Sequence, residues 1–243
     1  MSLDVDREFE ALNHGSGWPR GKPKACMIHA TRSGQARRTS LAGHRLETRS
    51  TINWFKSSAS RASTNLIVSP LEIVRMVSDD DYAWHAKEHS DWTYSVEVTQ
   101  ALPSDPYLDG HYELLGRAGR HYVSLGVPPV YLPHFSNGME GFTGHEDSEQ
   151  GVRDGKSDPG PEFDWPRFIA SIQEPASKED DMKPFLAWDR DRQRIYLVGP
   201  WGASWIVTAK DVKKFGEMYG KLEVGFGKET LDALDQKVTI PAL

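Results

Sequence analysis

The pattern of hydrophobic and polar positions changes repeatedly along the first 172 residues, and it predicts strands interleaved with helices. Short apolar or alternating runs predict four strands, at residues 24–29, 63–69, 72–77 and 93–99. Helical patterns predict three helices, at residues 47–56, 107–125 and 164–172. Elements in this order are typical of an α/β domain built around one sheet.

A second pattern begins beyond residues 173–182, QEPASKEDDM, which are polar, contain proline and predict a linker. Apolar runs then predict three short strands, in KPFLAW, RIYLVG and WGASWIV, and helices fit residues 208–220 and 228–236. We therefore expect a large α/β domain over residues 1–175 and a small α+β module over residues 183–243. The module's tryptophans fit a carbohydrate-binding platform or its own core, and its small size favours the core.

The composition narrows the class of protein. The chain has 243 residues, of which 38% are hydrophobic and 26% charged, as in a folded globular protein. Its net charge of −6 argues against nucleic-acid binding, and its single cysteine excludes an intrachain disulfide. The amino terminus lacks the pattern of a secretory signal, and no apolar run is long enough to cross a membrane. We expect a monomer made in the cytoplasm, without membrane insertion or a nucleic-acid partner.

The stretch GHEDSEQGVRDGKSDPGPEFDW, residues 144–165, combines metal-binding residue types with a polar, glycine-rich loop. It contains His145 and Asp158, and it has too few apolar side chains to pack a core of its own. His29 ends the first predicted strand, which would fix its backbone. A catalytic zinc site commonly takes three protein ligands of these types and leaves one position for water. Spacing alone does not distinguish such a site from ordinary surface histidines.

Five short segments follow one another along the chain, namely MIHAT at 27–31, AWHA at 83–86, YSVEV at 94–98, GHED at 144–147 and KSDPGPEFDW at 156–165. Together they resemble the zinc-dependent N-acetylmuramoyl-L-alanine amidases of the type-2 amidase family, which are related to peptidoglycan recognition proteins. The resemblance covers roughly residues 20–172. It implies a mixed sheet with helices on its faces and a groove floored by zinc. It also implies hydrolysis of the amide between N-acetylmuramic acid and the L-alanine of the stem peptide in bacterial peptidoglycan.

The resemblance assigns three metal ligands. His29 and His145 would be the imidazole ligands of zinc, and Asp158 would be the carboxylate ligand. Zinc would activate water and polarise the amide carbonyl. Cys26 lies three residues before His29, so in a strand its side chain faces the opposite side. We therefore interpret Cys26 as a buried apolar side chain and not as a ligand.

The resemblance also assigns catalytic and substrate-binding residues. Glu97 matches a glutamate of many bacterial members, and as a general base it would pass the water proton to the leaving amine. Lys156 would stabilise the negative charge on the carbonyl oxygen. The alternatives are a carboxylate on the solvent face of a strand and an ordinary loop lysine. His85 matches a position that lines the groove, and Trp84 could stack on a sugar ring, but both could instead be packing residues.

Three functions remain possible, namely a peptidoglycan amidase, a peptidoglycan-binding protein without turnover, and a scaffold with incidental histidines. We favour the amidase because all three candidate ligands, the candidate base and Lys156 are present. The lack of a signal together with an appended module suggests a phage endolysin that reaches the cell wall through a holin pore. A cytoplasmic amidase that recycles muropeptides is the alternative.

Overall fold

The computed structural model describes residues 3–34, 40–173, 185–189, 194–199 and 202–206. The chain divides into two compact units, Met1–Pro175 and Ala176–Leu243. The second unit contains an antiparallel three-stranded sheet, formed by β9 (Phe185–Asp189), β10 (Arg194–Gly199) and β11 (Gly202–Ile206). These strands lie where the sequence predicts them. The predicted linker beyond residue 173 and both predicted helices of the module lie outside the described residues, and the proposed roles of the two domains stay predictions.

The first unit is built on a six-stranded sheet with the order β1-β5-β4-β7-β3-β8. Its strands are β1 (Arg7–Glu8), β3 (Ala25–Ala30), β4 (Leu66–Val68), β5 (Ile73–Arg75), β7 (Tyr94–Val98) and β8 (Gly141–Gly144). Neighbouring strands run parallel, except β4 and β5, which pair antiparallel. The mixed α/β fold expected from the sequence is therefore confirmed.

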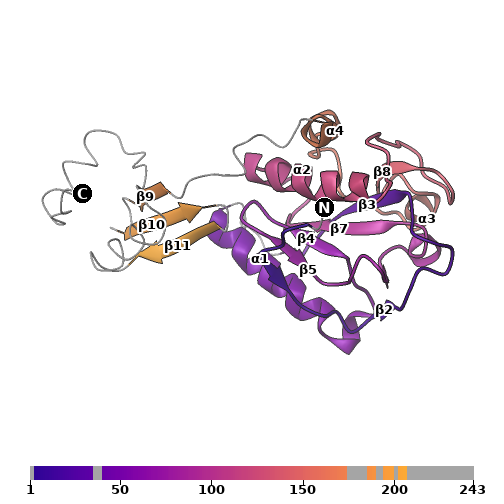
Figure 1. The fold of residues 1–243 in the computed structure, drawn as a ribbon, viewed down its shortest axis with the longest axis horizontal. Coiled ribbons are helices and arrows are strands. Elements are labelled where there is room, and N and C mark those ends of the chain that lie inside the picture. Colours follow the sequence, from indigo (N-terminus) through magenta and orange to yellow (C-terminus); the bar gives the residue numbers. More distant parts are fainter. Residues whose placement is uncertain (1–2, 35–39, 174–184, 190–193, 200–201, 207–243) are drawn as a thin grey trace, which may run out of the picture. The chain divides into compact units, whose positions relative to one another are not determined.

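Helices cover both faces of this sheet (Figure 1). On one face, α1 (Leu41–Phe55) packs Ile52 and Phe55 into a cluster with Ile67 of β4. On the other face, α2 (Asp109–Ser124) and α4 (Trp165–Gln173) pack on a larger cluster that includes Cys26 and Ile28 of β3. Among the described residues, no helix is both long and apolar enough to span a membrane.

Shorter elements complete the first unit. They are the paired strands β2 (His14–Gly15) and β6 (Tyr82–Ala83), the 3-10 turns Ser58–Ser60 and Lys87–His89, and the helix α3 (Glu149–Arg153). The turn Lys87–His89 and α3 are in contact with each other. Both lie next to the residues that the sequence assigns to the metal site.

Several elements differ from the sequence prediction, among them α3, which forms a short helix inside the stretch 144–165 described as a loop. The helix α1 begins at Leu41, well before the predicted start at residue 47, and Ser40 caps it by accepting a hydrogen bond from the Gly43 N–H. The segment directly before His145, where no strand is predicted, contains β8. The pattern misses this strand because GFTG has two glycines and no long apolar run. Its hydrogen bonds come from pairing with β3, which a local pattern does not reveal.

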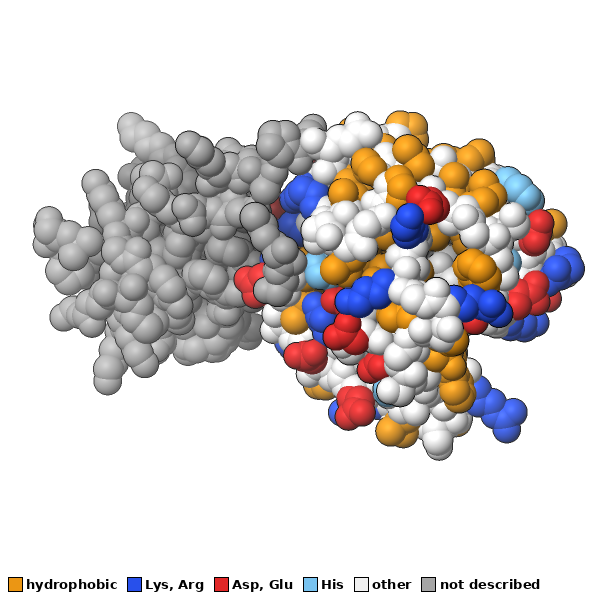
Figure 2. Space-filling model, turned by 45° about the vertical axis from the view of Figure 1, so that its right-hand side comes forward, with side chains coloured by type: hydrophobic (Ala, Val, Ile, Leu, Met, Phe, Trp, Pro, Cys, Tyr) orange, Lys and Arg blue, Asp and Glu red, His pale blue; other side chains and the backbone are white. Residues whose placement is uncertain are grey.

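The surface of the first unit carries acidic and basic side chains interspersed on the face seen in Figure 2. Several form ion pairs, among them Arg7 with Glu72 at 2.6 Å and Arg20 with Asp91 at 3.1 Å. Exposed pairs of this kind each contribute little to stability. The two apolar clusters on either side of the sheet therefore provide most of the stabilisation of the fold.

Candidate metal centre and active site

The central strand β3 positions His29. Successive side chains of a strand alternate between its two faces, and Cys26 and Ile28 enter the large cluster under α2. His29 consequently points to the opposite face, as expected, and it is buried. In the parallel neighbour β7, Glu97 is the register partner of His29, so both side chains project from the same face. On β7, Tyr94, Val96 and Val98 face the large cluster, which leaves Glu97 on the opposite face.

The edge strand β8 delivers His145 to the same place. Gly144 at the end of β8 is the register partner of Ile28, and the His145 N–H donates to the Ile28 carbonyl at 3.2 Å. The imidazole rings of His29 and His145 lie with their centroids 4.5 Å apart. Strand pairing thus brings together two histidines that are far apart in the sequence.

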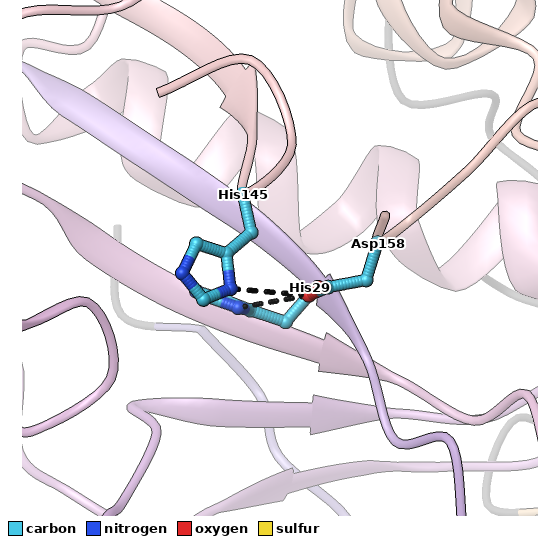
Figure 3. Close-up of side chains that lie close together, drawn as sticks. All are labelled: His29, His145 and Asp158. Carbon is cyan, nitrogen blue, oxygen red and sulfur yellow. Dashed lines mark hydrogen bonds and ion pairs between the residues drawn. The ribbon is translucent and has the colours of Figure 1, made fainter. Parts of the chain in front are cut away.

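Asp158 completes the cluster from the loop that follows α3. Its Oδ2 atom lies 3.2 Å from His29 Nδ1 and 3.4 Å from His145 Nδ1 (Figure 3). The candidate ligand atoms of the three residues all lie within 4.8 Å of one another. Two imidazole nitrogens and one carboxylate oxygen form a donor set that zinc accepts, with a fourth position left for water or substrate. The residues present therefore fit a zinc ion.

The electrostatics of the cluster favour the protonation states that a metal requires. Burial, and then the neighbouring His145, lower the pKa of His29 to about 4. Burial opposes ionisation of Asp158, but its contacts with His145 and His29 outweigh this effect and hold its pKa well below the usual range. At neutral pH the cluster thus offers a neutral imidazole and an ionised carboxylate.

Glu97 and Lys156 lie close to this cluster. Burial, followed by the negative charge of Asp158, raises the pKa of Glu97 to about 8. Its Oε2 atom is buried and has no hydrogen-bond partner among the described residues. Lys156 is exposed two residues before Asp158, and its positive charge lowers the pKa of both Glu97 and His29. The structure therefore brings together all five residues that the sequence assigned to the metal and to catalysis.

The two predicted substrate-binding residues have different environments. The Trp84 side chain is 43% exposed, so its ring is available for contact. His85 is half-buried, and its Nδ1 atom lies 2.9 Å from Nε2 of His29. It thus contacts a candidate metal ligand directly. Contact of either residue with substrate stays a prediction.

Sequence reasoning missed the residues that hold the Asp158 loop. The Arg32 guanidinium donates to the carbonyl oxygens of Ser157 at 3.1 Å and Pro159 at 2.9 Å, on either side of Asp158. The Tyr107 hydroxyl donates to the same Pro159 carbonyl at 3.0 Å. These partners are main-chain atoms, so no side-chain pattern indicates them. The position of Arg32 directly after MIHAT is the one signal that could have pointed to it.

Residues 19–161 match the family described as N-acetylmuramoyl-L-alanine amidase. The chain belongs to this family. It is 29% identical over 116 residues to the 1,6-anhydro-N-acetylmuramyl-L-alanine amidase AmpD of Enterobacter cloacae. It is 31% identical over 116 residues to AmpD of Salmonella typhimurium strain LT2. Each of these alignments covers 44% of this chain and 55% of the relative, so the chain spans about half the length of the curated relatives it matches.

Solved structures show the same fold. A Se-Met derivative of AmpD aligns over 71% of this chain and all of its own, with a TM-score of 0.53 and 20% identity. The Staphylococcus aureus hydrolase AmiA, solved with its ligand, aligns over 71% of this chain and 83% of its own, with a TM-score of 0.50 and 14% identity. The family resemblance and the fold class are therefore confirmed, whereas the metal and a phage origin stay predictions.

Proposed function

We propose that this chain is a zinc-dependent amidase that hydrolyses the bond between N-acetylmuramic acid and L-alanine in bacterial peptidoglycan. The chain belongs to the amidase family, and one observation of its structure carries the proposal. His29, His145 and Asp158 converge within 4.8 Å, and Glu97 projects from the neighbouring strand beside them. A donor set with an adjacent carboxyl group is what metal-assisted amide hydrolysis requires.

Each residue has a defined role in this reaction. His29, His145 and Asp158 would hold the ion, and zinc when bound supplies Lewis acidity that polarises the amide carbonyl and acidifies water. Because the charge of a bound ion would favour its ionised form, Glu97 can take a proton from the water that attacks the carbonyl carbon. Lys156 stabilises the negative charge that develops on the carbonyl oxygen. When the C–N bond breaks, Glu97 passes the proton to the leaving nitrogen, which yields a lactyl carboxylate and a peptide with a free amino terminus.

The test measures metal content and product release together. Protein purified without chelator should contain about one zinc per chain and release free stem peptide from purified sacculi. Asp158→Ala should lose most of the metal and most of the release. The matched control is His134→Ala, because His134 is an exposed histidine whose described ion-pair partner, Glu149, lies 3.9 Å away. Full zinc content and full turnover in Asp158→Ala would show that the ligand assignment is wrong.

The proposed biological setting is lysis of the cell wall by an endolysin, made in the cytoplasm and released to the wall. The support is the separate second unit, which could bind the wall. A second candidate is the recycling of soluble muropeptides, and the names of the curated relatives, 1,6-anhydro-N-acetylmuramyl-L-alanine amidases, favour it. Parallel assays on intact sacculi and on a soluble 1,6-anhydro-muramoyl peptide separate the two. Binding to sacculi without release of peptide from either substrate would instead indicate a non-catalytic binding protein.

A further inference from the structure

The two candidate histidine ligands make matching hydrogen bonds on the side away from Asp158. His29 presents Nδ1 to Asp158, and its Nε2 lies 2.9 Å from Nδ1 of His85. His145 likewise presents Nδ1 to Asp158, and its Nε2 lies 3.3 Å from Oε1 of Gln150. We propose that His85 and Gln150 are positioning residues, which hold both imidazoles in the tautomer whose Nδ1 lone pair faces the metal position. This inference rests on the metal site of the proposed function.

The direction of the His85 hydrogen bonds follows from Thr93. The Thr93 hydroxyl donates to the His89 carbonyl at 2.9 Å, so its Oγ1 presents a lone pair to Nε2 of His85 at 3.1 Å. The Thr93 carbonyl oxygen, which can only accept, lies 3.2 Å from the same nitrogen. Nε2 of His85 therefore carries a hydrogen. In a neutral ring its Nδ1 then accepts, so Nε2 of His29 donates and Nδ1 of His29 keeps its lone pair.

The orientation of Gln150 gives the same result for His145. The Gln150 amide nitrogen donates to the carboxylate of Asp154, and Asp154 also accepts from Lys87 at 2.5 Å. Because a carboxylate only accepts, the amide nitrogen of Gln150 must face Asp154, and Oε1 must face His145. Nε2 of His145 is then the donor. Its Nδ1, like that of His29, has a free lone pair.

The two arrangements meet at the buried residue His89. Its main-chain oxygen accepts from Thr93, and its Nε2 accepts from the main-chain N–H of Gln150 at 3.4 Å. Nδ1 of His89 lies 2.5 Å from Oδ1 of Asn137, where it donates. The supports of His29 and His145 are therefore parts of one connected hydrogen-bond network, in which every donor faces an acceptor.

The network turns three ligand atoms toward one position at the centre. In the tautomers that it favours, the Nδ1 lone pairs of His29 and His145 and the Oδ2 atom of Asp158 would all face a bound metal. In the absence of a metal the same Nδ1 atoms lie within 3.2 and 3.4 Å of Asp158 Oδ2, the contacts marked in Figure 3. The network therefore prepares the site for a metal. Partners of this kind fix the tautomer and orientation of a metal-binding histidine, and their loss commonly weakens metal binding 10- to 100-fold.

The experiment measures zinc affinity and tautomers, not only turnover. Zinc dissociation constants come from competition with a chromophoric chelator, for the wild type, His85→Phe, Gln150→Leu and the control His134→Gln. We expect roughly 10- to 100-fold weaker binding in the first two variants and an unchanged constant in the control. Gln150→Glu and His85→Asn keep an acceptor oxygen and should recover part of the affinity, and they replace the first pair if either does not fold.

Long-range proton–nitrogen NMR of the zinc-loaded wild type reads the tautomers directly. The proposal requires zinc on Nδ1 and a hydrogen on Nε2 in both His29 and His145. Ligation of either ring through Nε2, or unchanged affinity in both truncating variants, would overturn it. A wild type that binds zinc through both Nδ1 atoms but releases no peptide would support this inference and contradict the proposed function. A wild type that binds no zinc would overturn both.

Discussion

Replacing Glu97 with glutamine tests whether the carboxyl group assigned to catalysis also destabilises the fold. Glu97 is half-buried on β7, and one of its oxygens has no hydrogen-bond partner among the described residues. Burial, and then the charge of Asp158, raise its pKa from 4.5 to about 8. Glutamine keeps the shape of the side chain and removes the titration. The stabilities of the two proteins should therefore diverge with pH.

Proton linkage gives the sign and size of this pH dependence of the free energy of unfolding. Between pH 4.5 and about 8 the unfolded chain ionises Glu97 while the folded chain keeps it protonated. The unfolded state then binds fewer protons, so the free energy of unfolding of the wild type falls as the pH rises. One pKa unit corresponds to about 1.4 kcal/mol. The raised pKa of Glu97 therefore lowers the free energy of unfolding by about 3 kcal/mol at pH 7, but by less than about 1 kcal/mol at pH 5. From pH 5 to pH 7, the free energy of unfolding of Glu97→Gln should therefore rise by about 2 kcal/mol relative to that of the wild type.

The assay is urea unfolding of both proteins in the presence of a chelator, at pH 5 and pH 7, followed by circular dichroism. Comparing the two proteins cancels the titration of every other group. Parallel pH dependence of the wild type and the variant would refute the argument that Glu97 is protonated in the metal-free fold. Loaded with zinc, the variant should keep its metal and lose activity by roughly 100-fold or more. Near-normal turnover would assign the role of base to another group.

Three further outcomes are expected. Arg32→Met removes two hydrogen bonds to the Asp158 loop, each worth about 1 kcal/mol, so it should lower zinc affinity in a competition titration. Arg117→Met, which removes a bond to the Asp4 carbonyl on the surface, is the control and should not. A chain ending before Met182 should still bind zinc and cleave a soluble muramoyl peptide, because every assigned residue precedes the cut; loss of folding on truncation would contradict the proposed boundary. Burial, and then His44, lower the pKa of His111 to about 3, so the unfolded state binds more protons below pH 6.5. Stability should therefore fall on acidification by up to about 1.4 kcal/mol per pH unit, and chemical unfolding of His111→Gln should show a shallower slope.

The sequence predicted elements whose signal is local and missed those whose signal is not. The strands β3, β4, β5 and β7 are mostly buried and rich in apolar residues, which a hydrophobic pattern reveals. The first turns of α1, residues 41–46, were missed because the residues that they bury, Gly43 and His44, are not large apolar ones. The strand β8 was missed because its pairing with β3, and not its composition, makes it a strand.

In the candidate site too, the sequence reveals residues that stand in local motifs and misses those that depend on contacts in the folded chain. His29, His145 and Asp158 stand in motifs that a reader of the sequence can recognise, and the register of parallel strands brings two of them together. Gln150 and Arg32 act through hydrogen bonds to a side chain or carbonyl that only the folded chain places beside them. Arg32, for example, reaches a carbonyl 127 positions away. Composition and spacing carry no information about such partners.

The distance along the chain between the ligands has a consequence for synthesis. His29 and Asp158 are separated by 129 positions. The strand β3, which carries His29, pairs with β8, which is made late in synthesis. At typical rates of translation, on the order of ten seconds pass between the emergence of the first ligand and the last. For most of that interval, until β8 and His145 are made, the ribosome-bound chain has one candidate ligand and no edge strand to carry the second. On the proposed function, the chain can therefore capture its metal only after β8 and the Asp158 loop have been made, and the order of synthesis keeps it inactive until then.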